Sequence, residues 1–373
     1  MNSQAISPFR IAVPQEELDD LRERLDRTRF TEELPDAGWD YGVPVGYVRD
    51  LVAHWRTGYD WRVWEAKLNQ HPQFTTEIDG QRIHFLQVLS PEPGATPLIL
   101  THGWPGSIAE FVDVIGPLTD PRAHGGDPAT AFHLVVPSLP GFGFSGPTAG
   151  RGWGPRRIAA AWAELMTRLG YDRFCVAGND WGTFVSLELG RLAPERVVGV
   201  HVTQIFTGPS GEPGELDDLT EDEQAAMDNE RQFEETMSAY AVLQTQQPQS
   251  LAHALADSPA GLLGWHCLIY RGGLDPDFIL TNVMIHWLSG TVASAMRIYY
   301  EARQEAPAAP TTVPVALAQF SEDTKPVRRF VHRDHKNLVS WNVFDRPGHF
   351  AATQSPDLLI TDIQAFFKRL LGH

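Results

Sequence analysis

The sequence is poor in cysteine and in basic residues, and both shortages narrow the classes of protein to consider. Its 373 residues include two cysteines, Cys175 and Cys267, and Cys175 lies inside an apolar, strand-like run. A reduced core thiol is therefore expected there rather than a disulfide. Only 30 Lys and Arg stand against 47 Asp and Glu, which gives a net charge of −17. Because phosphate binding requires clustered cations, nucleic acid is disfavoured as a partner, and so is an anionic membrane surface.

The sequence also has no long apolar run and no segment that resembles a targeting signal. No stretch approaches the roughly 18 uninterrupted apolar residues of a transmembrane helix. The N-terminal MNSQAISPFRIAVPQEEL has no basic segment followed by an apolar stretch. We therefore expect a cytoplasmic protein that does not contact a membrane. His332 and His335 are not accompanied by an HExxH motif or a cysteine pair, so no metal site is expected.

What the sequence does contain is an alternation of strands and helices. Hydrophobic residues make up 42% of the chain and charged residues 21%, which is typical of a globular protein with a large core. Residues 14–30 predict an amphipathic helix, and residues 74–89 predict a hairpin around Asp79-Gly80. Apolar strands are then expected at 97–100, within 132–145, at 174–178 and at 197–203, with helices at 156–170 and 181–194. This order favours an α/β protein with a mostly parallel sheet and helices on both faces.

The alternation stops near residue 205, where a long helical block begins. Residues 205 to about 305 have a helical pattern, and Thr220 with Glu223 predicts a capping box at the start of one helix. A helical block inserted late in a doubly wound sheet is interpreted as a lid. Before the sheet, an aromatic-rich stretch with Trp55, Trp61 and Trp64 is expected to pack on something larger.

The end of the chain returns to the strand and helix pattern. Residues 313–320 and 338–344 predict the last two strands. Ser355-Pro356 predicts the start of a closing helix, with Ser as N-cap and Pro in the first turn. The predicted units are an N-terminal meander (1–72), a first core segment (73–204), the lid (205–306) and a second core segment (307–373).

A strand-to-helix turn at 174–184, FCVAGNDWGTF, has the outline of a nucleophile elbow. Gly178 and Gly182 flank Asp180, at the place where the usual G-x-S-x-G motif has serine. The glycines fit a sharp turn that leaves no room for side chains. The alternative is that Asp180 only caps the following helix, which is an ordinary role for aspartate.

Two more groups follow the ends of predicted parallel strands, where ligands bind in open α/β sheets. His349, in RPGHFAA, follows the last strand, and Asp323 with its neighbour Glu322 follows the strand before it. The chain order is nucleophile, acid, histidine. Asp323 is the preferred acid partner of the imidazole and Glu322 the second choice, while Asp334 and Asp345 are also near in sequence. The acid would hold one tautomer of the imidazole and stabilise it as it gains a proton.

The loop THGWPGS at 101–107 follows the predicted strand 97–100. In this type of fold the loop donates one backbone N–H to an oxyanion hole, and the residue after the nucleophile donates the second. The two donors would be the backbone N–H groups of Trp104 and Trp181. We expect the Trp104-Pro105 peptide bond to be cis, since a sharp turn would direct the loop inward.

In these motifs the chain resembles the microsomal-type epoxide hydrolases of the α/β-hydrolase superfamily, including their N-terminal domain. The similar segments are FRIAVPQEELDDLRERLDRTRF, WRTGYDWRVWEAKLNQHPQFTTEIDG, HGWPGS, GNDWG, ALADSPAGL and RPGHFAA. The resemblance implies that two lid tyrosines act as the electrophilic pair, and Tyr240 and Tyr299 fall at those positions, with Tyr300 as the rival for the second. It also implies Asp323 as the acid. Pro347-Gly348 and the FSED segment depart from the usual family pattern in their loops.

The resemblance implies a specific reaction. Asp180 would attack one carbon of a small-molecule epoxide, Tyr240 and Tyr299 would hydrogen-bond the ring oxygen, and His349 would activate water to hydrolyse the resulting ester. No metal or organic cofactor is implied. The natural epoxide is not implied either; detoxification and secondary metabolism, such as antibiotic assembly, are both open, and so is a homodimer.

Two other readings compete with this one. Dehalogenases use the same Asp elbow but need halide donors, and some place the acid after the strand equivalent to 197–203. Here that strand leads into Gln204-Ile205-Phe206-Thr207, without a carboxylate. A non-catalytic binding protein on the same fold is the third reading, and it would be expected if the nucleophile or the histidine were missing.

Overall fold

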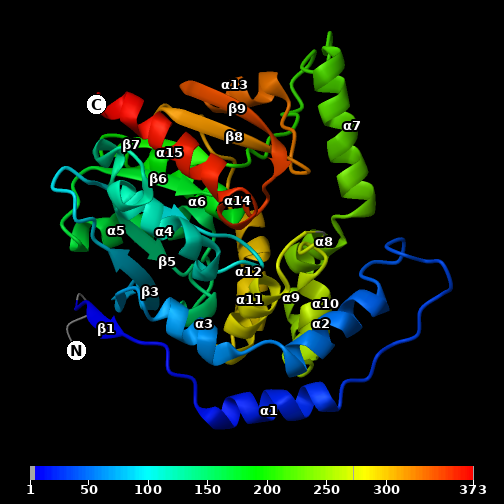
Figure 1. Ribbon diagram of the computed structural model, residues 1–373. Coiled ribbons are helices and arrows are strands. Elements are labelled where there is room, and N and C mark those ends of the chain that lie inside the picture. Colours follow the sequence, from blue (N-terminus) through cyan, green and yellow to red (C-terminus); the bar gives the residue numbers. More distant parts are fainter. Residues whose placement is uncertain (1–4, 272, 373) are drawn as a thin grey trace.

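The computed structural model describes residues 5–271 and 273–372. Within these residues, nine strands form one sheet in the order β1-β2-β3-β5-β4-β6-β7-β8-β9. Six neighbouring strands of this sheet run parallel to one another: β5, β4, β6, β7, β8 and β9. On the β5 side, β3, β2 and β1 follow, and each pairs antiparallel with its neighbour. Helices cover both faces of the sheet (Figure 1). The predicted fold class is confirmed.

The strand bounds agree with the sequence-based prediction to within a few residues. The strands are Ser7–Phe9 (β1), Gln73–Ile78 (β2), Gln81–Val88 (β3), Thr96–Thr101 (β4), Phe132–Pro137 (β5), Phe174–Gly178 (β6), Val197–Val202 (β7), Val315–Ser321 (β8) and Leu338–Pro347 (β9). We did not predict β1. It has three residues and contains a proline, and it forms only because the edge of β2 offers it partners.

The two faces of the sheet are covered by helices of the predicted core segments. Val112–Thr119 (α4) and Pro356–Leu371 (α15) lie on one face, and Pro155–Arg168 (α5) and Trp181–Leu192 (α6) lie on the other (Figure 1). The short 3₁₀ turns Ile108–Phe111 (η1), Pro121–His124 (η2), Pro128–Thr130 (η3) and Gly143–Ser145 (η4) lie in the connections.

One prediction about the closing helix is wrong in detail. The helix α15 begins at Pro356, as expected, and Ser355 holds the N-cap position, but its side chain does not cap the helix. The short helix Ala351–Gln354 (α14) comes directly before it. The hydroxyl of Ser355 instead donates to the carbonyl of Pro347, at 2.7 Å, and so ties the break between the two helices to the end of β9.

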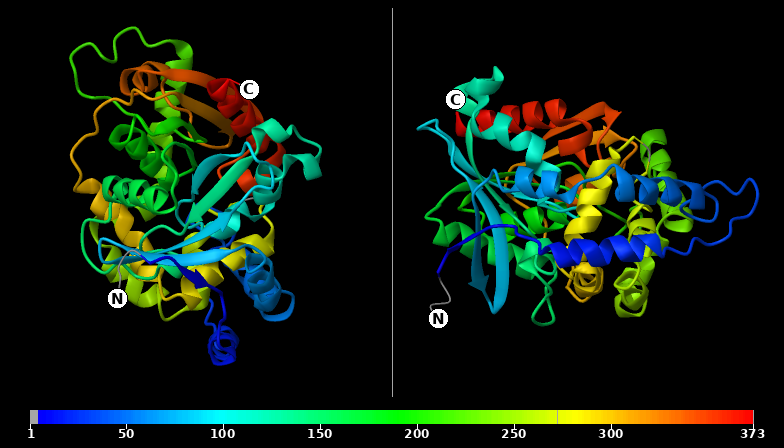
Figure 2. Two further views of the ribbon diagram at one scale, coloured as in Figure 1. Left: turned by 90° about the vertical axis from the view of Figure 1, so that its left-hand side faces the viewer. Right: turned by 60° about the horizontal axis from the view of Figure 1, so that its bottom comes forward.

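The N-terminal segment packs against the helical block. Gln15–Asp26 (α1), Val45–Thr57 (α2) and Trp61–Leu68 (α3) run along one side of the molecule, as both figures show (Figure 2). Trp55 and Trp61 are buried, and the indole N–H of Trp55 points to the sulfur of Met284 at 3.3 Å. His54 pairs with Asp277 at 2.6 Å. The aromatic stretch therefore packs on a larger body, as predicted.

The predicted helical block is present, but its first helix begins at Glu221 and not near residue 205. It lies between β7 and β8 in the chain and consists of Glu221–Thr236 (α7), Ala239–Gln246 (α8), Pro248–Leu255 (α9), Pro259–His266 (α10), Pro276–Leu288 (α11) and Val292–Arg303 (α12). The four-way domain division stays a prediction.

Within the described residues no single helix has the length and apolar composition to cross a membrane; α11 and α12 pass such a test as a pair, but with a bend of 92°.

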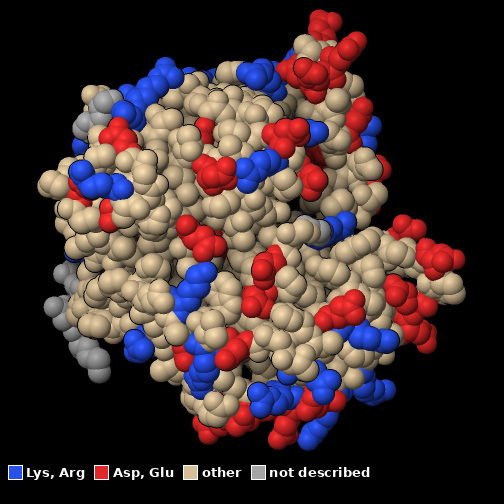
Figure 3. Space-filling model, in the orientation of Figure 1, with Lys and Arg blue, Asp and Glu red and all other residues tan. Residues whose placement is uncertain are grey.

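The helix α7 extends away from the rest of the block and is fixed at its first turn. The capping box of Thr220 and Glu223 is present, and acidic residues fill the first turn, where they stabilise the positive end of the helix. Figure 3 shows acidic side chains gathered at this end of the helix. Ala226 and Met227 pack against Val327 and Phe330 of the core.

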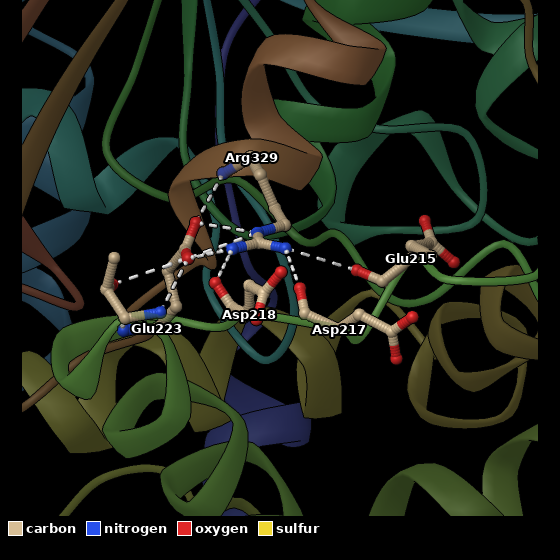
Figure 4. Close-up of polar contacts among 6 residues, drawn as sticks. Glu215, Asp217, Asp218, Glu223 and Arg329 are labelled. Carbon is tan, nitrogen blue, oxygen red and sulfur yellow. Dashed lines mark hydrogen bonds and ion pairs between the residues drawn. The ribbon is translucent and has the colours of Figure 1, made fainter.

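Arg329 connects this first turn to the core. It lies in Arg328–Asp334 (α13), and its guanidinium donates to the Glu223 carboxylate at 2.7 Å (Figure 4). It also donates to the backbone carbonyls of Asp217 and Asp218, at 2.9 and 2.8 Å. The hydrogen bond from Arg329 lowers the pKa of Glu223 to about 2, so the pair stays ionised at any pH near neutrality.

We predict that Arg329→Ala loosens the attachment of α7 to the core, because Arg329 bonds both to Glu223 in the first turn of the helix and to the backbone carbonyls of Asp217 and Asp218 in the loop before it. Amide hydrogen exchange in residues 208–220 should become faster by about tenfold or more, measured by mass spectrometry. Arg231→Ala is the control, since Arg231 forms one exposed pair with Asp228 on the same helix. Equal exchange in both variants would show that the apolar contacts alone hold α7.

Candidate active site

The turn between β6 and α6 has the geometry of a nucleophile elbow. Asp180 has φ 50° and ψ −123°, a left-handed conformation that non-glycine residues rarely adopt. A Cβ on Gly178 would overlap the backbone of Gly182, and one on Gly182 would overlap the carbonyl of Thr101. The side chain of Asp180 does not cap α6. The glycines are thus required by the close approach of three backbone segments, as predicted.

Two backbone N–H groups converge on the Asp180 carboxylate. The N–H of Trp104 donates to Oδ1 at 2.7 Å, and the N–H of Trp181 is a second donor. The Trp104-Pro105 peptide bond is cis, as expected. Because a Cβ on Gly103 would overlap the Asp180 carboxyl group, the loop after β4 comes this close only with glycine at that position. The predicted donors of Trp104 and Trp181 are therefore brought together at the nucleophile position.

His349 and Asp323 meet at the same edge of the sheet. Nδ1 of His349 lies 3.2 Å from Oδ1 of Asp323, and Nε2 of His349 is buried without a partner among the described residues. The backbone N–H of Thr324 donates to Oδ1 of Asp323 at 2.8 Å. The imidazole is thus held on one side by a carboxylate and has its other nitrogen available.

The other carboxylates considered as acid partners lie elsewhere. Glu322 is exposed, and its backbone has a positive φ of 62°. Asp334 is bound by Arg333, and Asp345 is exposed at the end of β9. Glu322, Asp334 and Asp345 form no hydrogen bond or ion pair with His349 in the part of the chain that the structure describes. Of the four candidates, the geometry brings only Asp323 to the imidazole.

Gln204 links these parts, and we did not predict its role. Its Oε1 accepts from the backbone N–H of Asp180 at 2.8 Å, and its Nε2 donates to Oδ2 of Asp323 at 2.5 Å. The same Nε2 reaches the carbonyl of His349 at 3.3 Å. Gln204 lies just after β7, so the rule about carboxyl ends of strands could have found it. The sequence pattern shows only that position 204 carries no carboxylate.

Tyr240 and Tyr299 lie together over the two tryptophans of the site. Their ring centroids are 6.1 Å apart, and the ring of Tyr299 meets Trp181 at 4.7 Å. The ring of Tyr240 stacks on Trp104 at 5.3 Å. Tyr300, the rival position, is 43% exposed and belongs to the outer face of α12. The arrangement brings Tyr299, and not Tyr300, to Trp181, the residue after Asp180.

The charges of the site act on one another. Burial raises the pKa of Asp180 above its ordinary value, although His349 and the N–H groups of Trp104 and Trp181 oppose this effect. Burial also raises the pKa of Asp323, but His349, Gln204 and Thr324 outweigh it and hold that pKa below its ordinary value.

Burial shifts the pKa values of the imidazole and the tyrosines in opposite directions, whereas the nearby carboxylates raise the pKa of both kinds of group. Burial lowers the pKa of His349, but Asp323 first, and then Asp180 and Glu110, raise it to about 9. Burial and then the charge of Asp180 raise the pKa of Tyr240 above its ordinary value. Burial does the same for Tyr299, with Tyr240 and Asp180 adding to it. Both tyrosines therefore remain neutral O–H donors.

A second residue that we did not predict is Glu110 in η1. It is 1% exposed, and the side-chain amide of Asn179 donates to its Oε1 at 2.7 Å. A single acidic residue in the apolar stretch IAEF was the only signal in the sequence.

Among the described residues, no group of three or more His, Cys, Asp or Glu side chains is arranged to hold a metal ion.

Comparison with known families agrees with this arrangement. Residues 6–111 match the family model described as "Epoxide hydrolase N terminus". Residues 96–263 match the model of the alpha/beta hydrolase fold. The first match covers the N-terminal helices and the loop that carries Trp104, and the second covers the elbow.

Individual relatives extend over nearly the whole chain. A protein of Stigmatella aurantiaca named "Putative epoxide hydrolase" is 41% identical, over 98% of this chain and 85% of the relative. Epoxide hydrolase 1 of Oryctolagus cuniculus is 33% identical, over 98% of this chain and 89% of the relative. The solved structure of Aspergillus niger epoxide hydrolase superposes with a TM-score of 0.85 at 30% identity, over 98% of this chain and 97% of that one.

We predict that Asp323→Asn lowers the pKa of the His349 imidazole from about 9, because it removes the largest interaction that raises it. The titration is measured by NMR of the histidine ring. Since the folded pKa lies above the ordinary value of about 6.5, the pair stabilises the fold fully below pH ~6.5, and this contribution is lost as the pH rises through about 9. The stability difference between wild type and variant should shrink over the same range.

Asp362→Asn is the matched control for this measurement. Asp362 pairs with a different buried histidine, His201, at 2.7 Å. Its loss should leave the titration of His349 unchanged. A His349 pKa that does not move in Asp323→Asn would contradict the assigned pairing.

Proposed function

The chain belongs to the epoxide hydrolase family, and we propose that it opens a small-molecule epoxide to a vicinal diol through a covalent ester on Asp180. The observation that carries this proposal is the position of one carboxylate. Asp180 stands at the elbow with two backbone N–H donors, two tyrosines over the tryptophans of the site, and the imidazole of His349 near enough for its charge to lower the pKa of Asp180. This combination supplies a nucleophile, an electrophilic pair and a base.

In the first half-reaction, Asp180 attacks one carbon of the epoxide. The C–O bond of the ring breaks, and the leaving oxygen takes up negative charge. The O–H groups of Tyr240 and Tyr299 stabilise this oxygen and supply its proton, which solvent returns to them. Their raised pKa values, caused first by burial, keep both tyrosines protonated until the ring opens.

In the second half-reaction, water hydrolyses the ester. His349 must be neutral to accept a proton from that water, yet in the free enzyme the surrounding carboxylates raise its pKa to about 9. Ester formation neutralises Asp180 and removes one of these carboxylates, so the pKa of His349 falls when the base is needed. The N–H groups of Trp104 and Trp181, which bond the carboxylate before reaction, then stabilise the oxyanion of the tetrahedral intermediate.

A carboxylate suits this chemistry better than serine. A serine alkoxide would form an ether with the epoxide carbon, and no easy hydrolysis would follow. The ester of Asp180 can be cleaved by water, and the nucleophile is regenerated.

A halide-releasing reaction has one observation in its favour, because the indole N–H of Trp104 is buried without a partner among the described residues. Turnover of styrene oxide against 1-chlorobutane separates the two activities.

A cleft beside the site offers a route for the substrate. It has a volume of about 470 Å³ and lies between α7 and the loop after β8. Its lining residues include Ile205, next to Gln204, and Thr324, next to Asp323. Glu230 of the same cleft contributes to the raised pKa of Tyr240, after burial and the two site carboxylates. We propose that small-molecule epoxides enter here and that the natural one belongs to detoxification or secondary metabolism.

We propose that the enzyme acts in the cytoplasm. The net charge of −17 supports an enzyme without nucleic-acid or membrane partners. A homodimer is part of the same proposal. Sedimentation of the purified chain decides between monomer and dimer.

We predict that His349→Ala traps the ester, because alkylation proceeds without the base but hydrolysis does not. Mass spectrometry of quenched protein should find the mass of the epoxide added to the peptide that contains Asp180. In wild-type protein, a single turnover in ¹⁸O-water should place the label in Asp180 and leave the diol unlabelled. Label that appears directly in the diol would show that water attacked the ring itself.

We predict that Tyr240→Phe and Tyr299→Phe slow the alkylation step by roughly 10²-fold each, since each removes one donor to the leaving oxygen. Rapid-quench measurement of adduct formation reports this step. Tyr300→Phe is the matched control, because Tyr300 is the adjacent, exposed tyrosine of the same helix. An equal loss in the Tyr300 variant would point to a general disturbance of α12.

A further inference from the structure

Gln244 is a polar side chain buried in the helical block beside the two site tyrosines. It lies in α8, whose residues are all described, and it is the only buried residue of that helix. Gln244 is 0% exposed. Buried positions of this kind are usually apolar, and a buried amide needs partners for both its oxygen and its nitrogen. The proposed reaction does not use this amide.

The oxygen of the amide has a partner, but the nitrogen does not. Oε1 of Gln244 accepts from the indole N–H of Trp265 at 3.0 Å. Nε2 is buried and forms no hydrogen bond of good geometry with the described residues. Because an indole N–H can only donate, its bond to Oε1 fixes which side of the amide carries the oxygen. The N–H groups of Gln244 are therefore held in one direction.

The group on which this amide acts is the phenol of Tyr299. Gln244 lies one turn after Tyr240 on the same side of α8, and α8 packs against α12, the helix that carries Tyr299. The rings of the two tyrosines are 6.1 Å apart. Burial raises the pKa of Tyr299, Tyr240 and Asp180 add to this effect, and contacts with Trp181 and Gln244 oppose it. Gln244 is thus near the phenolic oxygen without a fully formed hydrogen bond to it.

The side chain of Trp181 approaches the same phenol from the core. Its ring meets the ring of Tyr299 edge-on at 4.7 Å. The single polar group of an indole is an N–H, which can only donate, and a phenolic oxygen that accepts a hydrogen bond can still donate its own hydrogen. Tyr299 therefore has one donor on the core side, one on the lid side, and an O–H left for the substrate.

Tyr299 depends on such donors more than Tyr240 does. Tyr299 is 8% exposed, whereas Tyr240 is partly exposed. When a tyrosine gives its proton to the leaving oxygen, negative charge moves onto the phenolic oxygen, and burial penalises that charge. Solvent can stabilise the charge on the more exposed ring. On the buried ring, fixed N–H donors of the protein have to do so.

We propose that Gln244 is a positioning residue for ring opening: its amide nitrogen, held by Trp265, hydrogen-bonds the phenolic oxygen of Tyr299 as that tyrosine gives its proton to the epoxide oxygen. This inference rests on the proposed opening of an epoxide by Asp180. The contact is loose before the reaction and tightens as charge develops, so it stabilises the transition state more than the free enzyme. Gln244 acts through Tyr299 and does not contact the reacting atoms.

Proton and charge balance in this step. The carboxylate of Asp180 forms a bond to one ring carbon, the C–O bond of the ring breaks, and the proton of Tyr299 passes to the leaving oxygen. The charge left on Tyr299 is stabilised by the N–H groups of Gln244 and Trp181 until solvent returns a proton. Hydrolysis of the ester later releases one proton to solvent, so the full cycle consumes only the epoxide and water.

The test measures the coupling between Gln244 and each tyrosine. Gln244→Met removes the amide and keeps a side chain of similar length. Rapid-quench mass spectrometry should find alkylation slowed by roughly tenfold and ester hydrolysis within about threefold of wild type. The same change should slow Tyr240→Phe by a similar factor. It should have little further effect in Tyr299→Phe, because the oxygen on which the amide acts is already absent there.

Two further variants keep the test decisive. Trp265→Phe removes the N–H that holds the amide and should slow alkylation selectively, by about threefold or more, also if Gln244→Met does not fold. Gln246→Met is the matched control, since Gln246 is an exposed glutamine of the same helix. It should leave both rates unchanged.

The outcomes distinguish this inference from the proposed function. Normal alkylation in folded Gln244→Met, or equal slowing of both half-reactions, would overturn the role of Gln244 while the ester mechanism stands. An equal effect of Gln244→Met in Tyr299→Phe and in Tyr240→Phe would do the same, and so would normal alkylation in Trp265→Phe. If no ester forms even in His349→Ala, the proposed function itself fails.

Discussion

The structure depends on the contact between the Asp180 carboxylate and the backbone of the loop after β4. The N–H of Trp104 reaches Oδ1 at 2.7 Å only because Gly103 has no side chain in the way. The same contact requires Asp180 to keep a left-handed backbone, which its flanking glycines permit. A buried carboxylate in a strained turn is unfavourable by itself. It persists because the donors and the imidazole surround it, which is also what a nucleophile of this kind requires.

Much of the fold could be predicted, because its signals are local. Strand periodicity, the Gly-rich elbow and the Thr220 capping box each depend on a few adjacent residues, and the structure has all three. The three-residue β1 could not be found, since it exists only through pairing with β2. The side chain of Ser355 was assigned wrongly because a short helix precedes it, and the sequence pattern marks the position but not the competing partner at Pro347.

The sequence predicts those residues of the site that directly follow the ends of parallel strands. Asp180, Asp323 and His349 all follow parallel strands, and the structure brings them together. Gln204 and Glu110 escaped because their importance lies in contacts across 119 and 69 residues of sequence. Neither the amide of Gln204 nor the isolated Glu110 belongs to a sequence motif that would indicate its role. Their contribution is seen only when the partners that they bond are fixed in space.

Gln204 has a physical reason to be an amide. The site already holds the carboxyl groups of Asp180, Asp323 and Glu110 against one imidazole, and these raise the pKa of His349 to about 9. A fourth carboxylate at position 204 would raise it further and would repel Asp323, whose Oδ2 now accepts from the amide. His349 would then stay protonated after the ester forms and could not act as a base. A neutral residue that both donates and accepts holds the acid and the elbow in place, and it leaves the charge of Asp180 as the one that changes during the reaction.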